Sequence, residues 1–135
     1  MKKVLLVDDD ELFNYLNRRL LEKSGFASEI FVAYSGEQAL SLWKEWYTSG
    51  VSLPDFIFLD LRMPVMDGFQ FLERFSKLPP ECIDHVRIVI LTSSLDAEDK
   101  EKVFQYNPVV GFLNKPLNKK SIGRLMHEFG MDSSL

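Results

Sequence analysis

Five short apolar runs recur along the chain, each four or five residues long and without alternation of polar and apolar positions. They are Val4–Val7, Ile30–Ala33, Phe56–Leu59, Ile88–Leu91 and Val109–Leu113. Runs of this kind, rich in β-branched and aromatic residues, are typical of strands that are buried on both faces. The pattern therefore predicts five strands at the centre of the molecule.

Apolar residues at helical spacing occupy the stretches between these runs, which predicts helices that pack one face on a sheet. The predicted core-facing positions are Leu12, Leu16 and Leu20; Ala39, Leu40 and Trp43; Gly68, Phe71, Leu72 and Phe75; and Ile122, Leu125, Met126 and Phe129. Residues 97–106 have only a partial apolar stripe among many charges, and we expect a helix there too. Strands that alternate with helices predict an α/β, doubly wound domain, in which helices cover both faces of a parallel sheet.

Length and composition indicate one soluble domain. The chain has 135 residues and 46% hydrophobic content, enough for a single core. We expect this domain to span residues 1–130, with a frayed tail over 131–135 and no output domain. The N-terminus lacks the apolar core of a signal peptide, and no stretch is long enough to span a membrane. We therefore expect a cytoplasmic protein without a membrane partner.

Charge and cysteine content exclude further classes of function. A formal net charge of -4 argues against nucleic-acid binding, because nucleic-acid binders usually carry a basic patch. Cys82 is the only cysteine, so the chain has neither an internal disulfide nor a cage of cysteine metal ligands.

Polar residues with reactive or charged groups follow four of the five predicted strands. They are Asp8, Asp9 and Asp10 after the first strand, Asp60 after the third, Thr92 after the fourth and Lys115 shortly after the fifth. Because the carboxyl ends of parallel strands meet at one edge of a sheet, we expect these side chains to converge there. One of the three consecutive aspartates is expected to cap the helix that follows. Asp60, flanked by apolar residues, needs a cation or hydrogen-bond donors beside it.

The chemistry that this set favours is transfer of a phosphoryl group to a carboxylate. Carboxylates held close together repel one another and require a hard cation that prefers oxygen, and Mg²⁺ fits best. One carboxylate can then attack phosphorus, while the metal and the Lys115 ammonium neutralise charge on the phosphoryl oxygens. Thr92 would donate a hydrogen bond to one of these oxygens.

These residues resemble the response-regulator receiver family of two-component systems over essentially the whole chain. The resemblance rests on Val7-Asp8-Asp9, Asp60-Leu61-Arg62-Met63-Pro64, Met66-Asp67-Gly68, Leu91-Thr92-Ser93 and Lys115-Pro116. It implies a flavodoxin-like fold with strand order 2-1-3-4-5 and helices on both faces of the sheet. The motifs are similar to those of stand-alone receivers of the chemotaxis type.

The resemblance also implies a role for single residues. The implied roles are metal binding for Asp8, Asp9, Asp60 and the Arg62 backbone carbonyl; phosphate acceptance for Asp60, assisted by Thr92 and Lys115; switching for Thr92 and Phe112; tuning of dephosphorylation for Arg62 and Ser94; and a cis peptide bond before Pro116. Many receivers have tyrosine where Phe112 stands. Any switching by Phe112 must therefore act through packing rather than through a hydroxyl group.

The implied function is that of a single-domain response regulator, a phospho-acceptor switch and not a turnover enzyme. A sensor histidine kinase or a histidine phosphotransfer protein would supply the phosphoryl group. The product would regulate a separate partner or relay the phosphoryl group, through the face formed by residues 97–106, the strand of Phe112 and residues 119–129. One alternative is an aspartate-nucleophile phosphatase, which would need aspartate where Arg62 stands; another is a degenerate receiver that acts only as a scaffold.

Overall fold

A computed structural model of the protein describes residues 2–93 and 96–131 of the chain. The described residues form one sheet of five strands: β1 (Lys2–Val7), β2 (Ala27–Ala33), β3 (Phe56–Asp60), β4 (Arg87–Thr92) and β5 (Val109–Asn114). All neighbouring strands are parallel, in the order β2-β1-β3-β4-β5. The five predicted strands and the predicted flavodoxin-like strand order are therefore confirmed.

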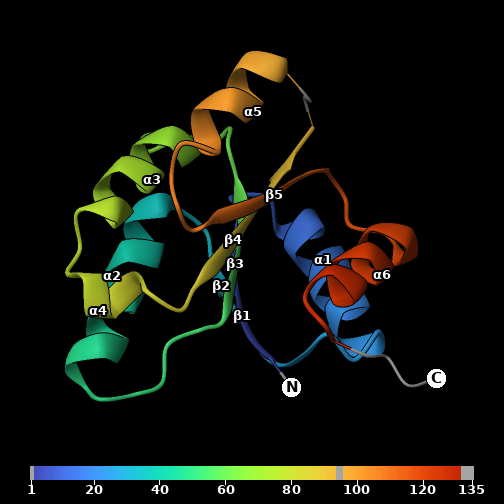
Figure 1. The fold of residues 1–135 in the computed structure, drawn as a ribbon, viewed down its shortest axis with the longest axis horizontal. Coiled ribbons are helices and arrows are strands. Elements are labelled where there is room, and N and C mark those ends of the chain that lie inside the picture. The colour runs from blue at the N-terminus through green and yellow to red at the C-terminus, as the bar shows by residue number, and fades with distance from the viewer. Residues whose placement is uncertain (1, 94–95, 132–135) are drawn as a thin grey trace.

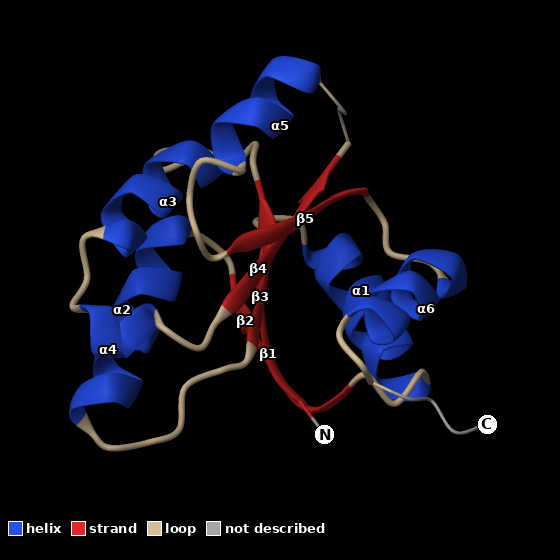
Figure 2. Ribbon diagram, viewed as in Figure 1, coloured by secondary structure: helices blue, strands red, loops and turns tan. Residues whose placement is uncertain are grey.

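Helices cover both faces of the sheet. They are α1 (Glu11–Lys23), α2 (Gly36–Thr48), α3 (Gly68–Ser76), α4 (Pro80–Ile83), α5 (Ala97–Val103) and α6 (Lys119–Glu128). Figure 1 shows α1 and α6 side by side on one face and α2, α3, α4 and α5 on the other. Figure 2 shows that the sheet forms the middle layer, which confirms the doubly wound architecture. None of the helices in the described part of the chain is long and apolar enough to cross a bilayer.

Two apolar clusters, one on each face of the sheet, form the core. The apolar faces predicted for α2, α3 and α6 point into these clusters, with Phe129 at the end of α6 partly buried. Trp43, on α2, contacts the Phe75 ring of α3 edge to face at 5.1 Å. The indole Nε1 of Trp43 also donates a hydrogen bond of 2.8 Å to the Cys82 carbonyl. This hydrogen bond attaches α4, which the sequence pattern did not predict, to α2.

The core-facing stripe predicted for α1 was wrong for Leu12 and Leu16, whereas Leu20 is partly buried against the core. Leu12 and Leu16 are 63% and 43% exposed, whereas Asn14, Asn17 and Leu21 are the buried residues of the helix. The spacing of the leucines is helical, but Leu12 and Leu16 lie on the exposed side of the helix. Asn14 and Asn17 are buried because each forms a hydrogen bond to backbone near the carboxyl edge of the sheet. Tertiary hydrogen bonds thus decide which face of α1 is covered.

The helix predicted for residues 97–106 is shorter than expected. α5 ends at Val103, which is its buried residue, and Phe104 caps it and is 41% exposed. Tyr106 is partly buried against the core cluster on the same face of the sheet.

Candidate functional site

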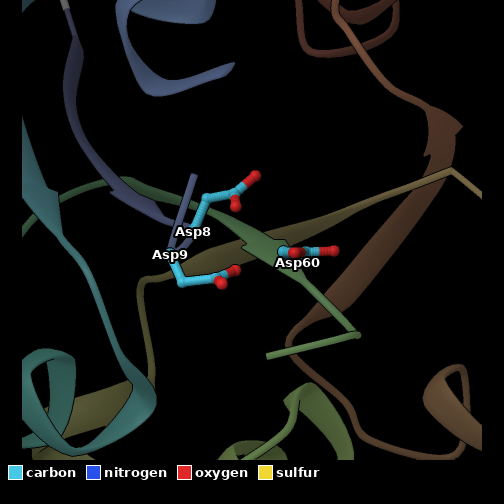
Figure 3. A group of neighbouring side chains, drawn as sticks. All are labelled: Asp8, Asp9 and Asp60. Carbon is cyan, nitrogen blue, oxygen red and sulfur yellow. The ribbon is translucent and has the colours of Figure 1, made fainter. Parts of the chain in front are cut away.

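Three aspartates gather at the carboxyl edge of the sheet. Asp8 and Asp9 directly follow β1, and Asp60 is the last residue of β3. One carboxylate oxygen from each lies within 4.8 Å of the others, and Figure 3 shows the three side chains beside the ends of these two strands. Asp8 and Asp60 are only 5% and 4% exposed, whereas Asp9 is exposed. Because β1 and β3 are adjacent in the sheet, residues 52 positions apart converge.

Lys115 brings a positive charge into this cluster. Its Nζ lies 2.8 Å from Asp8 Oδ2 and 3.2 Å from Asp60 Oδ2, and its side chain is 7% exposed. The Lys115–Pro116 peptide bond is cis. The ammonium contacts two of the three carboxylates in the cluster, so the three acidic groups outnumber the one cation beside them.

Burial and repulsion change the protonation of the cluster. Burial raises the pKa of Asp60 from its usual 3.8 to about 6; the negative charge of Asp8 adds to this rise, and Lys115 opposes it. Burial opposes the charge on Lys115, but the hydrogen bond to Asp8 and the charges of Asp60 and Asp8 raise the pKa of the ammonium. The folded protein therefore disfavours the ionised form of the Asp60 carboxyl.

Short-range hydrogen bonds hold the acidic segment in place. Asp10 is the aspartate that caps α1, since its Oδ1 accepts hydrogen bonds from Leu12 N at 2.8 Å and Phe13 N at 3.2 Å. Asp10 N donates to Asp8 Oδ1 at 2.9 Å, and Asp8 N donates to the Ala33 carbonyl of β2 at 3.1 Å. Asp10 therefore has the capping role expected for one of the three aspartates, and the other two carboxylates lie in the cluster.

The loop between β3 and α3 surrounds Asp60. Arg62 N donates to Asp60 Oδ1 at 3.3 Å. A side chain at Gly68 would place Cβ 2.8 Å from the Asp60 carbonyl oxygen, so glycine allows α3 to begin directly against the end of β3. The Arg62 guanidinium lies 2.5 Å from Asp99 on α5. Arg62, which was predicted to tune dephosphorylation, thus forms an ion pair with α5.

The remaining predicted residues lie on β4 and β5. Thr92 is 1% exposed at the end of β4, where it pairs in register with Asn114 of β5. Phe112 is partly buried and packs against the core cluster on the α2 and α3 face. Ser94 lies outside the described residues.

Three residues of α1 that sequence reasoning did not single out contact the site. The Phe13 ring centroid lies 4.3 Å from Lys115 Nζ, and Asn14 Nδ2 donates to the Asp8 carbonyl at 2.8 Å. Asn17 Oδ1 accepts a hydrogen bond from Leu117 N at 3.0 Å. The available signal was the spacing of Asn14 and Asn17, which puts two amides on one helix face directly after three aspartates.

Comparisons with known proteins agree with one another. A family model described as the response regulator receiver domain matches residues 4–127. The probable methanogenesis regulatory protein FilR2 of Methanothrix harundinacea is 31% identical over 93% of this chain and 79% of its own length. Chemotaxis protein CheY of Halobacterium salinarum is 30% identical over 90% of both chains. This chain spans only 7% of two hybrid histidine kinases of Dictyostelium discoideum that it also matches.

Solved structures show the same similarity. The crystal structure of a two component response regulator from Cytophaga hutchinsonii has 28% sequence identity and a TM-score of 0.86, and the match covers 96% of this chain and 97% of that one.

Proposed function

The chain belongs to the response regulator receiver domain family, and on that basis we propose that Asp60 is the residue that accepts a phosphoryl group. Members of this family are generally phospho-acceptor switches in two-component signalling, phosphorylated by histidine kinases or phosphotransfer proteins. The observation that carries the proposal is the position of Lys115, whose ammonium is hydrogen-bonded to Asp8 and lies 3.2 Å from Asp60. A buried carboxylate beside a fixed ammonium suits an acceptor of a charged phosphoryl group.

The donor set fits Mg²⁺. Asp8, Asp9 and Asp60 each offer a carboxylate oxygen, and these oxygens lie within 4.8 Å of one another. Three carboxylates also carry more negative charge than the one Lys115 ammonium beside them can neutralise. Asp8, Asp9, Asp60 and the backbone carbonyl of Arg62 would hold the ion. Bound there, Mg²⁺ would neutralise charge on the phosphoryl oxygens.

In the proposed reaction, a carboxylate oxygen of Asp60 attacks the phosphorus of a phosphohistidine. The new bond joins Asp60 to phosphorus as the bond from phosphorus to the imidazole nitrogen breaks, and the imidazole leaves with the electron pair. Lys115 then exchanges its contact with Asp60 Oδ2 for one with a phosphoryl oxygen and keeps its hydrogen bond to Asp8. The Thr92 hydroxyl donates to another phosphoryl oxygen.

The proposed switch follows from chain connectivity. Thr92 ends the strand that leads into α5, so drawing its hydroxyl toward the phosphoryl group changes the space open to Phe112, which pairs with the adjacent strand β4. The Phe112 ring can change rotamer within a packed site and so give two discrete states. The face formed by α5, β5 and α6 would report this change to a separate partner, or the phosphoryl group would pass on to a phosphotransfer protein.

The test is incubation with acetyl phosphate and magnesium, followed by intact mass. We expect the wild-type protein to gain one phosphoryl group, and Asp60→Asn and the wild-type protein in chelator to gain none. Asp84→Asn is the matched control, because it removes an exposed carboxylate at the opposite end of the sheet. A phosphoryl adduct that persists in Asp60→Asn would refute the assignment.

A further inference from the structure

The buried face of α1 is polar where it meets the site. Asn14 and Asn17 are 3% and 2% exposed, whereas Leu12 and Leu16 of the same helix are exposed. A buried amide is costly unless its hydrogen bonds are formed, so two of them in place of apolar residues require partners. Asn14 Nδ2 and Asn17 Oδ1 each have a backbone partner beside the site, whereas Asn14 Oδ1 has no hydrogen-bond partner among the described residues.

Asn17 holds the segment that carries Lys115. Its Oδ1 accepts a buried hydrogen bond of 3.0 Å from Leu117 N, which is two residues beyond Lys115. Asn118 follows and caps α6. The bond therefore attaches the stretch between β5 and α6 to α1 at a point next to Lys115.

The same face of α1 contacts both partners of the ion pair. The Phe13 ring centroid lies 4.3 Å from Lys115 Nζ, and Asn14 Nδ2 donates to the Asp8 carbonyl at 2.8 Å. Phe13 and Asn17 are four residues apart, so they lie on one helix face. One rigid helix thus holds the ammonium, the backbone beyond it and the backbone of the carboxylate it binds.

We propose that Asn17 is a positioning residue for Lys115, with Phe13 and Asn14 completing the same support. Through Leu117 it keeps the ammonium at the distance from Asp8 and Asp60 at which it can meet a phosphoryl group. This role rests on the proposed function, since Lys115 matters to the reaction only if Asp60 accepts a phosphoryl group. This role would account for the burial of Asn14 and Asn17 on a helix whose Leu12 and Leu16 are exposed.

The first test is amide hydrogen exchange of the unphosphorylated protein, which needs no assumption about its reaction. Asn17→Leu keeps a similar volume but removes the acceptor, and we expect Leu117 N–H to exchange about tenfold faster or more relative to its neighbours. Leu21→Val is the matched control, because it weakens packing on the same helix and makes no polar contact with the site. Unchanged protection of Leu117 in Asn17→Leu would overturn the proposal.

The second test is a double-mutant cycle of Asn17→Leu with Lys115→Gln, read from the rate of phosphorylation by acetyl phosphate. Asn17→Leu should slow the reaction about tenfold when Lys115 is present, since small misplacements of a reacting group are costly, and should have little further effect without it. Equal slowing in both backgrounds would mean a structural role only and would overturn the proposal. For variants that react too slowly, the same cycle can be measured as the increase in the free energy of unfolding when magnesium and beryllofluoride bind.

The proposed function and the role of Asn17 can fail independently, and the experiments distinguish the two failures. A wild-type protein that neither accepts phosphate nor binds beryllofluoride would refute the phosphorylation of Asp60. The exchange of Leu117 would still show whether Asn17 holds the segment.

Discussion

Asp60→Asn should stabilise the metal-free protein at pH 8, even though it removes the proposed phospho-acceptor. Burial and the charge of Asp8 raise the pKa of Asp60 from 3.8 to about 6, so the folded state disfavours the ionised carboxylate. At about 1.4 kcal/mol for each pH unit, this amounts to about 3 kcal/mol above pH 6. Asparagine resembles the neutral acid and leaves the 2.8 Å contact between Lys115 and Asp8 in place. The free energy of unfolding of the variant should therefore be up to about 3 kcal/mol higher than that of the wild type.

The sign of the pH dependence follows from the same shift. Between pH 3.8 and about 6 the folded wild-type protein binds more protons than the unfolded chain, so its free energy of unfolding falls as the pH rises through this window. The advantage of Asp60→Asn should thus be complete above pH 6 and absent near pH 4. Magnesium should reduce or reverse it, because the ion binds the folded wild-type cluster and compensates its charge.

The assay is urea unfolding of both proteins at several pH values, in chelator and in magnesium. Asp84→Asn is the control, since it removes an exposed carboxylate and should show no comparable gain. If Asp60→Asn were no more stable than the wild type at pH 8 in chelator, the charge of Asp60 would be fully compensated by Lys115, and the reasoning would be wrong.

Three further predictions concern the loop, the lysine and the ion pair with α5. Val65 has a φ of 68° and is 88% exposed, so Val65→Gly should relieve a left-handed strain and raise the free energy of unfolding by about 1 kcal/mol, measured by urea titration. Lys115→Ala should still accept phosphate slowly but lose the response, seen as unchanged amide exchange around Phe112 after beryllofluoride is added; a wild-type response would contradict this. Asp99→Asn should release the Arg62 guanidinium from α5 and change the rate of dephosphorylation severalfold, measured by the decay of the phosphoryl adduct, and this change should vanish in Arg62→Gln.

Much of the fold follows from the sequence because its cause is local. The five apolar runs become strands, and a sheet covered on both faces buries those of β1, β3 and β4 almost completely. The prediction of burial on both faces was wrong for the edge strands β2 and β5, which are only partly buried. Parallel strands then place their carboxyl ends together, which is why the sequence alone predicts Asp8, Asp60 and Lys115 at one edge of the sheet. The roles of these residues, of Thr92 and of Ser94, and the absence of an output domain, stay predictions.

Only the tertiary structure decided which helix residues are buried and which distant groups they contact. The leucine spacing of α1 predicted the wrong burial for Leu12 and Leu16, because Asn14 and Asn17 are buried instead. Asn17 accepts its hydrogen bond from Leu117, which lies 100 positions further along the chain, and Asn14 donates to the Asp8 carbonyl at the end of β1. The direction of Arg62 depends in the same way on Asp99, which lies 37 positions further along the chain. Periodicity records which residues share a face, whereas burial, pairing and a raised pKa depend on the groups that folding brings against that face.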